Sequence, residues 1–243
     1  MQDKPSVQDA ERAPSGLAAL RLAPDQGVSV TDRVHRLLRQ AIIGVQLAPG
    51  TPISENSLSQ QLSISRSPVR AAIQRLAEEG LVEVSPQRGS YVAALHMDQM
   101  HDSHFVRRSL ELALLHETAQ LWTPEMTAQL RAVIADQERA VNARDADLFL
   151  TLDETFHRTL AELSGRKGVW AAIQAPYTAL GRFHHYWAKM DRLADVLREH
   201  RAIIAALEQG DGDAAKAALA THLDMVFVIL DRMPEERRKQ LPF

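Results

Sequence analysis

The sequence predicts a mainly α-helical protein with two domains: a small one of three helices and a β-hairpin, then an all-α bundle of six longer helices. The chain has 243 residues, more than one ordinary domain needs. Apolar residues recur at helical spacing along most of it, and strand patterns occur only between residues 81 and 93. We expect four segments: a flexible leader at 1–30, the first domain at 31–95, the bundle at 96–232 and a tail at 233–243.

Composition excludes several classes of protein. Hydrophobic residues make up 45% of the chain and charged residues 24%, which is typical of a globular protein and not of a disordered one. The longest uninterrupted apolar runs have six residues, whereas a membrane helix needs about 20. There is no cysteine, so any metal must be held by His and carboxylate side chains. Because the leader contains no secretory signal, we expect a cytoplasmic protein that does not contact a membrane.

Three helices are expected in the first domain, each delimited by capping residues. Thr31 is a suitable N-cap, and apolar residues then repeat at helical spacing until Gly44. Pro68 is compatible with the third helix because a residue in the first turn needs no N–H donor. The expected limits are Thr31 to Gly44, Glu55 to Gln61 after the cap Ser54, and Ser65 or Ser67 to Gly80.

A β-hairpin should follow the third helix. Leu81–Val84 and Ser90–Ala93 have the composition of short strands. Between them stands Pro86–Gly89, a turn sequence. The first domain therefore runs helix, helix, helix, hairpin.

The third helix carries two arginines that suit contact with DNA. Arg66 and Arg70 are four residues apart, so they share one face of the helix, away from its apolar stripe. Two short helices joined by a tight turn fit the major groove of DNA, and the hairpin tip at 87–89 would reach the neighbouring minor groove. Composition alone also permits an ordinary solvated surface, but the spacing favours a DNA-binding one.

From Ile43 to Val92 the chain matches a known pattern at high density. The matching residues are Ile43-Gly44, Leu47, Pro49-Gly50, Ile53-Ser54-Glu55, Leu58, Leu62, Ser65-Arg66, Pro68-Val69-Arg70, Leu76, Glu79-Gly80-Leu81-Val82, Arg88-Gly89 and Val92. On these residues the stretch resembles the winged helix-turn-helix of GntR-family transcription regulators.

This resemblance implies a set of DNA contacts. They are Arg66 and Arg70 on guanine-bearing base edges, Ser65 and Ser67 on the DNA backbone, and Arg88 and Gly89 in the wing. Two residues depart from the family pattern: Asn56 stands where some members have Arg, and Ala71 where the family usually has an acidic residue. The family's operator sequence is therefore not carried over.

The second domain is expected to contain six helices and no strand. Caps, helix-starting prolines and helix-ending glycines divide it. The expected segments are 97–121, 124–143, 146–163, 167–188, 191–208 and 213–231.

One aspartate and three histidines interrupt the apolar faces of three of these helices. Asp153 and His157 lie four residues apart at the margin of one stripe, and His200 and His222 lie within apolar rows of the last two helices. Burying an unpaired polar group costs about 1 to 3 kcal/mol. A single histidine of this kind usually has an ordinary partner in the core, but four such residues favour a shared divalent ion. Imidazole and carboxylate ligands suit Zn, Ni, Mn or Fe.

Four short motifs extend the resemblance over about residues 98–230. Val106–Glu111, Asp153–His157, Glu199–Ile203 and Thr221–Leu223 match, in order, the ligand-binding domain of the FadR-like branch of the same family. The resemblance implies a six-helix bundle that holds a metal through Asp153, His157, His200 and His222, with a small organic acid as effector. Arg107 is expected to line the effector pocket, with Arg182 as a weaker second. Either arginine could instead be a surface ion-pair partner.

Together these features predict a homodimeric transcription regulator that is not an enzyme. It should bind an inverted repeat in double-stranded DNA and respond to a small carboxylate through its metal ion. The effector would shift the placement of the two DNA-binding domains, with a coupling free energy of about 1 to 3 kcal/mol. Two alternatives stay open: the metal is structural or is itself the signal, or the protein is a metalloenzyme with a DNA-binding domain.

Overall fold

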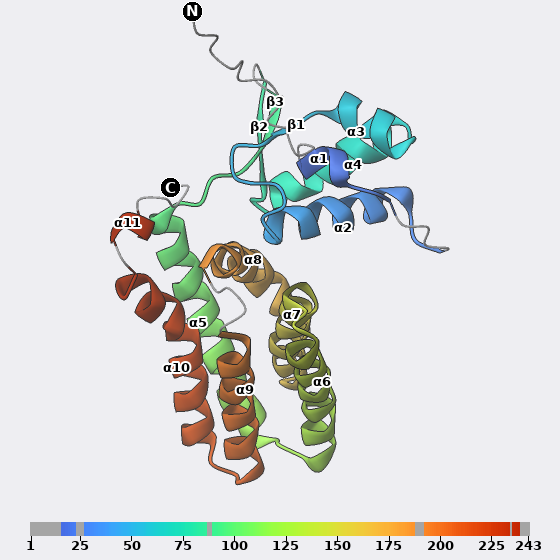
Figure 1. Cartoon of the computed structure of the whole chain (residues 1–243). Helices are drawn as coiled ribbons and strands as arrows, with labels where there is room; N and C mark the ends of the chain where they lie inside the picture. The colour runs from blue at the N-terminus through green and yellow to red at the C-terminus, as the bar shows by residue number, and fades with distance from the viewer. Residues whose placement is uncertain (1–15, 23–26, 87–88, 188–191, 234, 239–243) are drawn as a thin grey trace, which may run out of the picture. The chain divides into compact units, whose positions relative to one another are not determined.

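A computed structural model describes residues 16–22, 27–86, 89–187, 192–233 and 235–238 (Figure 1). The chain divides into two compact units. The first holds the residues up to Ala93 and the second those from Ala94 onward, except that Ile43–Val45 group with the second.

The first unit contains three main helices and a small antiparallel sheet. Strand β3 lies in the middle of the sheet, with β2 on one side and β1 on the other. The strands are β1 (Pro52–Ile53), β2 (Val82–Ser85) and β3 (Gly89–Val92), and the helices are α2 (Val30–Ile43), α3 (Glu55–Leu62) and α4 (Arg66–Glu78). The predicted helix-helix-helix-hairpin order is confirmed. Strand β1 was not predicted, because two residues are too few to show a pattern.

Capping residues set the turn between α3 and α4. The side chain of Ser54 accepts a hydrogen bond from the N–H of Ser57, which begins α3. Ser63 ends α3 in the left-handed conformation, and Ser65 is the N-cap of α4. Helix α4 then buries the apolar side predicted from its spacing, formed by Val69, Ala72, Ile73 and Leu76. Its opposite side is left exposed.

Part of the expected leader packs against the first unit. A short helix, α1 (Gly16–Ala19), is followed by Leu20, which is only 4% exposed. The amide of Gln61 on α3 donates hydrogen bonds to the carbonyl oxygens of Leu17 and Leu20. A single helical turn has no periodicity to detect, so the sequence did not indicate this contact. Residues 1–15 and 23–26 lie outside the described residues.

The second unit is all-helical in its described residues. Three of its helices begin at a side chain that accepts a backbone N–H: Thr123, Asp145 and Asp211. The helices are α5 (Met97–Gln120), α6 (Pro124–Ala143), α7 (Ala146–Leu163), α8 (Trp170–Trp187), α9 (Leu193–Glu208) and α10 (Gly212–Asp231), followed by the short α11 (Glu235–Arg238) within the expected tail. The predicted six-helix bundle is confirmed, with α8 beginning three residues later than expected.

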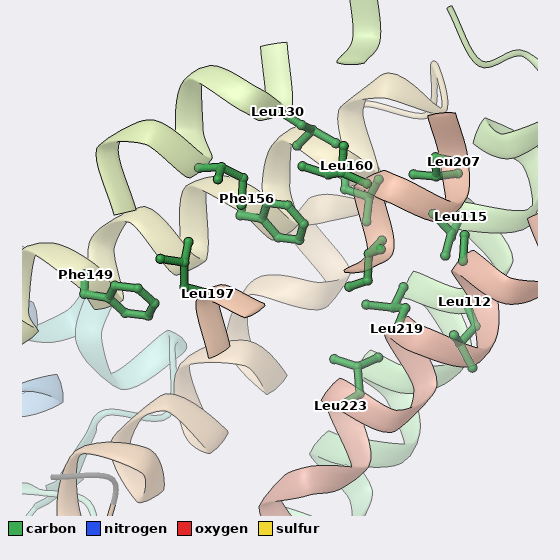
Figure 2. Packing of buried hydrophobic residues seen from close by; sticks show 14 of the residues in the cluster. Leu112, Leu115, Leu130, Phe149, Phe156, Leu160, Leu197, Leu207, Leu219 and Leu223 are labelled. Atoms are coloured by element: carbon green, nitrogen blue, oxygen red, sulfur yellow. The ribbon is translucent and has the colours of Figure 1, made fainter. Parts of the chain in front are cut away.

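The main core of the bundle lies between α5, α6, α7, α9 and α10. Phe149 and Phe156 of α7 are almost completely buried there, against leucines from the other four helices (Figure 2). A second cluster, which includes Leu114 of α5 with Trp170 and Ile173 of α8, fixes α8 to the bundle. None of the described helices combines the length and apolarity needed to cross a membrane.

Candidate functional site

Helices α7, α9 and α10 bring together the four residues that the sequence singled out as metal ligands. Asp153 and His157 stand one turn apart on α7, His200 lies on α9 and His222 on α10. Each offers a ligand atom, and these atoms all lie within 4.8 Å of one another. None of the four residues is more than 9% exposed. The cluster can hold a metal ion.

The ligand atoms face one another at short distances. The Nε2 atoms of His157 and His222 are 3.2 Å apart. Nε2 of His200 is 3.4 Å from Oδ1 of Asp153, and Nε2 of His157 is 3.9 Å from Oδ2 of the same carboxylate. Phe156 stacks on the His200 ring, with 3.9 Å between ring centroids. The result is three imidazole nitrogens and one carboxylate around a common point.

A second layer of side chains fixes the orientation of each imidazole. Nδ1 of His157 lies 2.6 Å from Oε2 of Glu111, Nδ1 of His222 lies 2.7 Å from Oε2 of Glu199, and Nδ1 of His200 lies 3.0 Å from Oε1 of Gln137. If each Nδ1–H donates to its oxygen, all three Nε2 lone pairs point into the cluster. Two such lone pairs 3.2 Å apart repel, whereas a cation between them would satisfy both.

Asp153 is oriented in the same way. The Tyr177 hydroxyl donates a 2.7 Å hydrogen bond to Oδ2 of Asp153. The guanidinium of Arg107 lies over the Tyr177 ring, 4.7 Å from its centroid. Arg107 also donates through Nε to Oε1 of Glu111, at 2.6 Å. Arg107 is therefore joined to the cluster on two sides, through Tyr177 and through Glu111.

The electrostatic environment suits cation binding. Burial by itself would raise the pKa of Glu111, but Arg107 and His157 outweigh it and lower that pKa to about 2. Burial also opposes ionisation of Asp153, and the surrounding imidazoles and Arg107 hold its pKa well below the ordinary value. Burial, reinforced by His222, lowers the pKa of His200 well below its usual range. Asp153 is thus anionic and His200 neutral at physiological pH, the forms that bind metals.

Three buried polar atoms of the described residues have no hydrogen-bond partner: Nε2 of His200, Nη2 of Arg107 and Nε2 of Gln137. A buried polar group without a partner costs about 1 to 3 kcal/mol, and two of the three atoms lie where a bound ligand could satisfy them. A metal ion would satisfy Nε2 of His200. An oxyanion would satisfy Nη2 of Arg107. The donor set therefore fits a metal ion, and Arg107 leaves one buried N–H donor available to a further acceptor.

Sequence reasoning missed the second layer. Glu111, Gln137, Tyr177 and Glu199 were assigned no role, although Glu111 and Glu199 belong to the matched motifs. Glu199 directly precedes His200, a weak local signal. Arg182 is also buried, at 3% exposed, so both expected effector residues lie inside the bundle.

The first unit displays the arginine-bearing side of α4 toward solvent. Arg66, Ser67 and Arg70 are all exposed. The N-cap Ser65 is exposed as well, and its side chain makes no capping hydrogen bond. Arg66 makes no hydrogen bond or ion pair within the described residues, and Arg88 lies outside them. Gly89 opens β3 with φ +93°, a conformation that favours glycine.

Arg70 differs from Arg66 in having a partner. Its Nε and Nη2 atoms donate to the carboxylate of Glu55 at the start of α3, at 3.0 to 3.1 Å. The Arg70 side chain is still 62% exposed. The pair holds the guanidinium at the surface and does not lock it into the interior.

Comparisons with known proteins cover both units. Residues 30–92 match the family described as "Bacterial regulatory proteins, gntR family", and residues 102–225 match the FCD domain. The HTH-type transcriptional repressor RspR of Escherichia coli (strain K12) is 34% identical over 209 residues, covering 85% of this chain and 90% of the relative. An HTH-type transcriptional regulator from an unstable DNA locus of Streptomyces ambofaciens is 35% identical over 203 residues, covering 82% of this chain and 84% of the relative.

Two solved structures have the same fold. A putative transcriptional regulator GntR from Rhodococcus sp. RHA1 superposes with a TM-score of 0.73 at 26% identity, covering 85% of this chain and all of that one. McbR/YncC of E. coli also superposes with a TM-score of 0.73, at 22% identity, covering 84% of this chain and 98% of that one.

Proposed function

Because the chain belongs to the gntR family of bacterial regulatory proteins, we propose that its helical bundle senses a small organic acid through a divalent metal ion and thereby controls DNA binding. Family membership makes it a DNA-binding transcriptional regulator with an FCD effector-binding domain. The families and relatives it matches are regulators, which removes the metalloenzyme alternative. We further propose that it acts as a cytoplasmic homodimer on an inverted repeat.

The observation that carries the metal proposal is the arrangement of the imidazoles. Each of the three Nδ1 atoms lies within 3.0 Å of an oxygen outside the cluster, so each Nε2 is free to bind a metal. Asp153, His157, His200 and His222 would be the ligands, and Zn, Ni, Mn and Fe all accept this set. When bound, the ion supplies a coordination position that a carboxylate can occupy directly.

Charge supports an acidic effector. Three carboxylates belong to the site: Asp153 lies within the cluster, and Glu111 and Glu199 each contact one of its imidazoles. Two guanidiniums bond these glutamates, Arg107 on Glu111 and Arg192 on Glu199. A divalent ion would turn the resulting single negative charge into a single positive one. Buried charge is costly unless it is compensated. One carboxylate placed between the ion and Nη2 of Arg107 would neutralise it.

The experiment is a titration of small carboxylates against the metal-loaded protein, read as operator affinity. Arg107→Lys is the informative variant. Lysine keeps a positive charge beside Glu111, but it has no atom equivalent to Nη2, the nitrogen that would bind the effector. We expect the variant to bind metal and operator as the wild type does, and to need about 10- to 100-fold more effector for the same response, a loss of one charged hydrogen bond.

This titration distinguishes a sensor of organic acids from a regulator that responds to the metal alone. If no acid changes operator affinity while metal alone does, the metal itself is the signal. If Arg107→Lys responds to the effector at wild-type concentrations, Arg107 does not contact it.

A further inference from the structure

Gln137 differs from the other side chains that orient the imidazoles of the cluster. Its amide faces Nδ1 of His200 at 3.0 Å, whereas the other two imidazoles face the carboxylates of Glu111 and Glu199. Gln137 lies on α6 and is completely buried, at 0% exposed. Of these three partners, the amide is the one that can donate a hydrogen bond as well as accept one. His200 can therefore carry its proton on either ring nitrogen, depending on how the amide is turned.

The two carboxylates hold their imidazoles in a single state. Arg107 donates to Glu111 and favours its ionised form. Arg192 does the same for Glu199. An ionised carboxylate only accepts hydrogen bonds, so each of these imidazoles keeps its proton on Nδ1 and turns the lone pair of Nε2 into the cluster.

The amide of Gln137 leaves one of its atoms unpaired in either orientation. With Oε1 toward His200, the Nε2 atoms of Gln137 and of His200 are both buried without a hydrogen-bond partner among the described residues. If the amide turns over, its Nε2 donates to Nδ1 of His200, and only Oε1 is left without a partner. One rotation thus reduces the number of unpaired atoms.

Asp153 supplies the partner for His200 in the turned arrangement. When Nδ1 accepts from the amide, the proton of His200 is on Nε2, which lies 3.4 Å from Oδ1 of Asp153. This distance is about 0.2 Å longer than an ordinary N–H···O hydrogen bond, so a small shift completes the contact. Phe156 stacks on the His200 ring at 3.9 Å between centroids, which holds the ring in its plane.

The two orientations of the amide therefore suit two states of the cluster. With Oε1 toward His200, the lone pair of its Nε2 is free for a metal ion. With the amide nitrogen toward His200, the imidazole bonds Asp153, and the cluster closes without an ion. The change takes a proton from Nε2 and places one on Nδ1 of the same ring, so the number of protons on His200 stays the same.

We propose that Gln137 is a positioning residue whose amide rotates to let His200 exchange its metal bond for a hydrogen bond to Asp153. The metal can then leave and return without a rearrangement of the helices. His200 is the ligand that adapts, and His157 and His222 are the fixed ones. This inference deepens the proposed function and rests on its metal-binding part.

The first test is the position of the proton on each imidazole, read from the NMR shifts of the ring nitrogens in the full chain with and without zinc. In the metal-free chain, His200 should carry its proton on Nε2, and His157 and His222 should carry theirs on Nδ1. With zinc, the proton of His200 should be on Nδ1 as well. A proton on Nδ1 of His200 in both states would overturn the inference.

Gln137→Met tests the amide by removing it. Methionine is similar in length and neutral, but it offers no strong donor or acceptor. The zinc-loaded variant leaves the Nδ1–H of His200 without an acceptor, so we expect zinc affinity to fall by about 10- to 100-fold, as for other lost supports of a ligand. Gln129→Met, at an exposed position of the same helix, is the control and should bind zinc as the wild type does. Equal zinc affinities in the two variants would contradict the role of the amide.

Glu199→Gln is the reciprocal variant, because it gives His222 an amide partner in place of a carboxylate. In the metal-free variant, the proton of His222 should move to Nε2, which lies 3.2 Å from Nε2 of His157 and can donate to it. If the proton of His222 stays on Nδ1, the amide does not control the state of the ring, and the inference fails.

Failure of this inference can be told apart from failure of the proposed function. A chain that binds zinc at the cluster and keeps the proton of His200 on Nδ1 throughout has no switch, but it can still sense an acid through the metal. A chain whose imidazole shifts do not respond to zinc has no metal site at the cluster, and both proposals fall. Loss of the operator response to acids alone leaves the switch in place.

Discussion

Replacement of Arg66 by Ala is expected to reduce affinity for the specific operator by at least about 30-fold. Arg66 is exposed at the first turn of α4, makes no bond within the described residues and is free to reach a base edge. A bidentate arginine contact to guanine contributes about 1 to 3 kcal/mol of discrimination, and a dimer makes it twice. The measurement is the ratio of the affinity for the operator to the affinity for a scrambled duplex. Both affinities are measured at the same salt concentration, because salt weakens both.

The same helix offers a matched control. Arg75 is nine residues further along α4, on the opposite side, where it bonds Asp32 of α2. Arg75→Ala removes the same charge but should keep the ratio of specific to scrambled binding. Arg70→Ala should lose specificity as Arg66→Ala does, with an added effect from leaving Glu55 without its partner. Equal specificity in the Arg66 and Arg75 variants would mean that another surface reads the operator.

The elements of the fold could be predicted because their signals are local. Caps such as Ser54 and Asp145 stand next to the helices they begin, and apolar periodicity needs only one helix to be visible. What escaped prediction depends on distant contacts. Helix α1 is held by Gln61, more than forty residues away, and β1 exists because β3 pairs with it.

Local signals also indicated the four candidate ligands, but not the side chains that orient them. Asp153, His157, His200 and His222 could be predicted because each interrupts an apolar row on its own helix. Gln137 of α6 is equally buried, but no pattern within α6 indicates that it faces Nδ1 of His200. Glu55 likewise sits at the start of α3 without any sign that it would bond Arg70. Partners supplied by another helix become visible only when the helices are packed together.

Removal of the metal should destabilise the bundle strongly. A ligand that binds only the folded state adds about 2.7 kcal/mol to the free energy of unfolding when its free concentration is a hundred times its dissociation constant. We therefore expect a chelator to lower the melting temperature of the wild type, and added divalent metal to restore it. The chelated protein should still fold, because the main core on α5, α6, α7, α9 and α10 does not depend on the cluster.

Asp153→Asn identifies the site responsible. Asparagine has nearly the same shape and can still accept the Tyr177 hydrogen bond, so the change removes a ligand charge without leaving a cavity. Loss of a residue that only supports a ligand costs about 10- to 100-fold in metal affinity, and loss of a ligand itself should exceed that range. Asp147→Asn, the same substitution at an exposed position of α7, is the control. The measurement is a calorimetric titration of both variants with the metal. Wild-type metal affinity in Asp153→Asn would mean that the metal binds elsewhere. A wild-type melting temperature that does not change with chelator would mean that the bundle holds no stabilising metal.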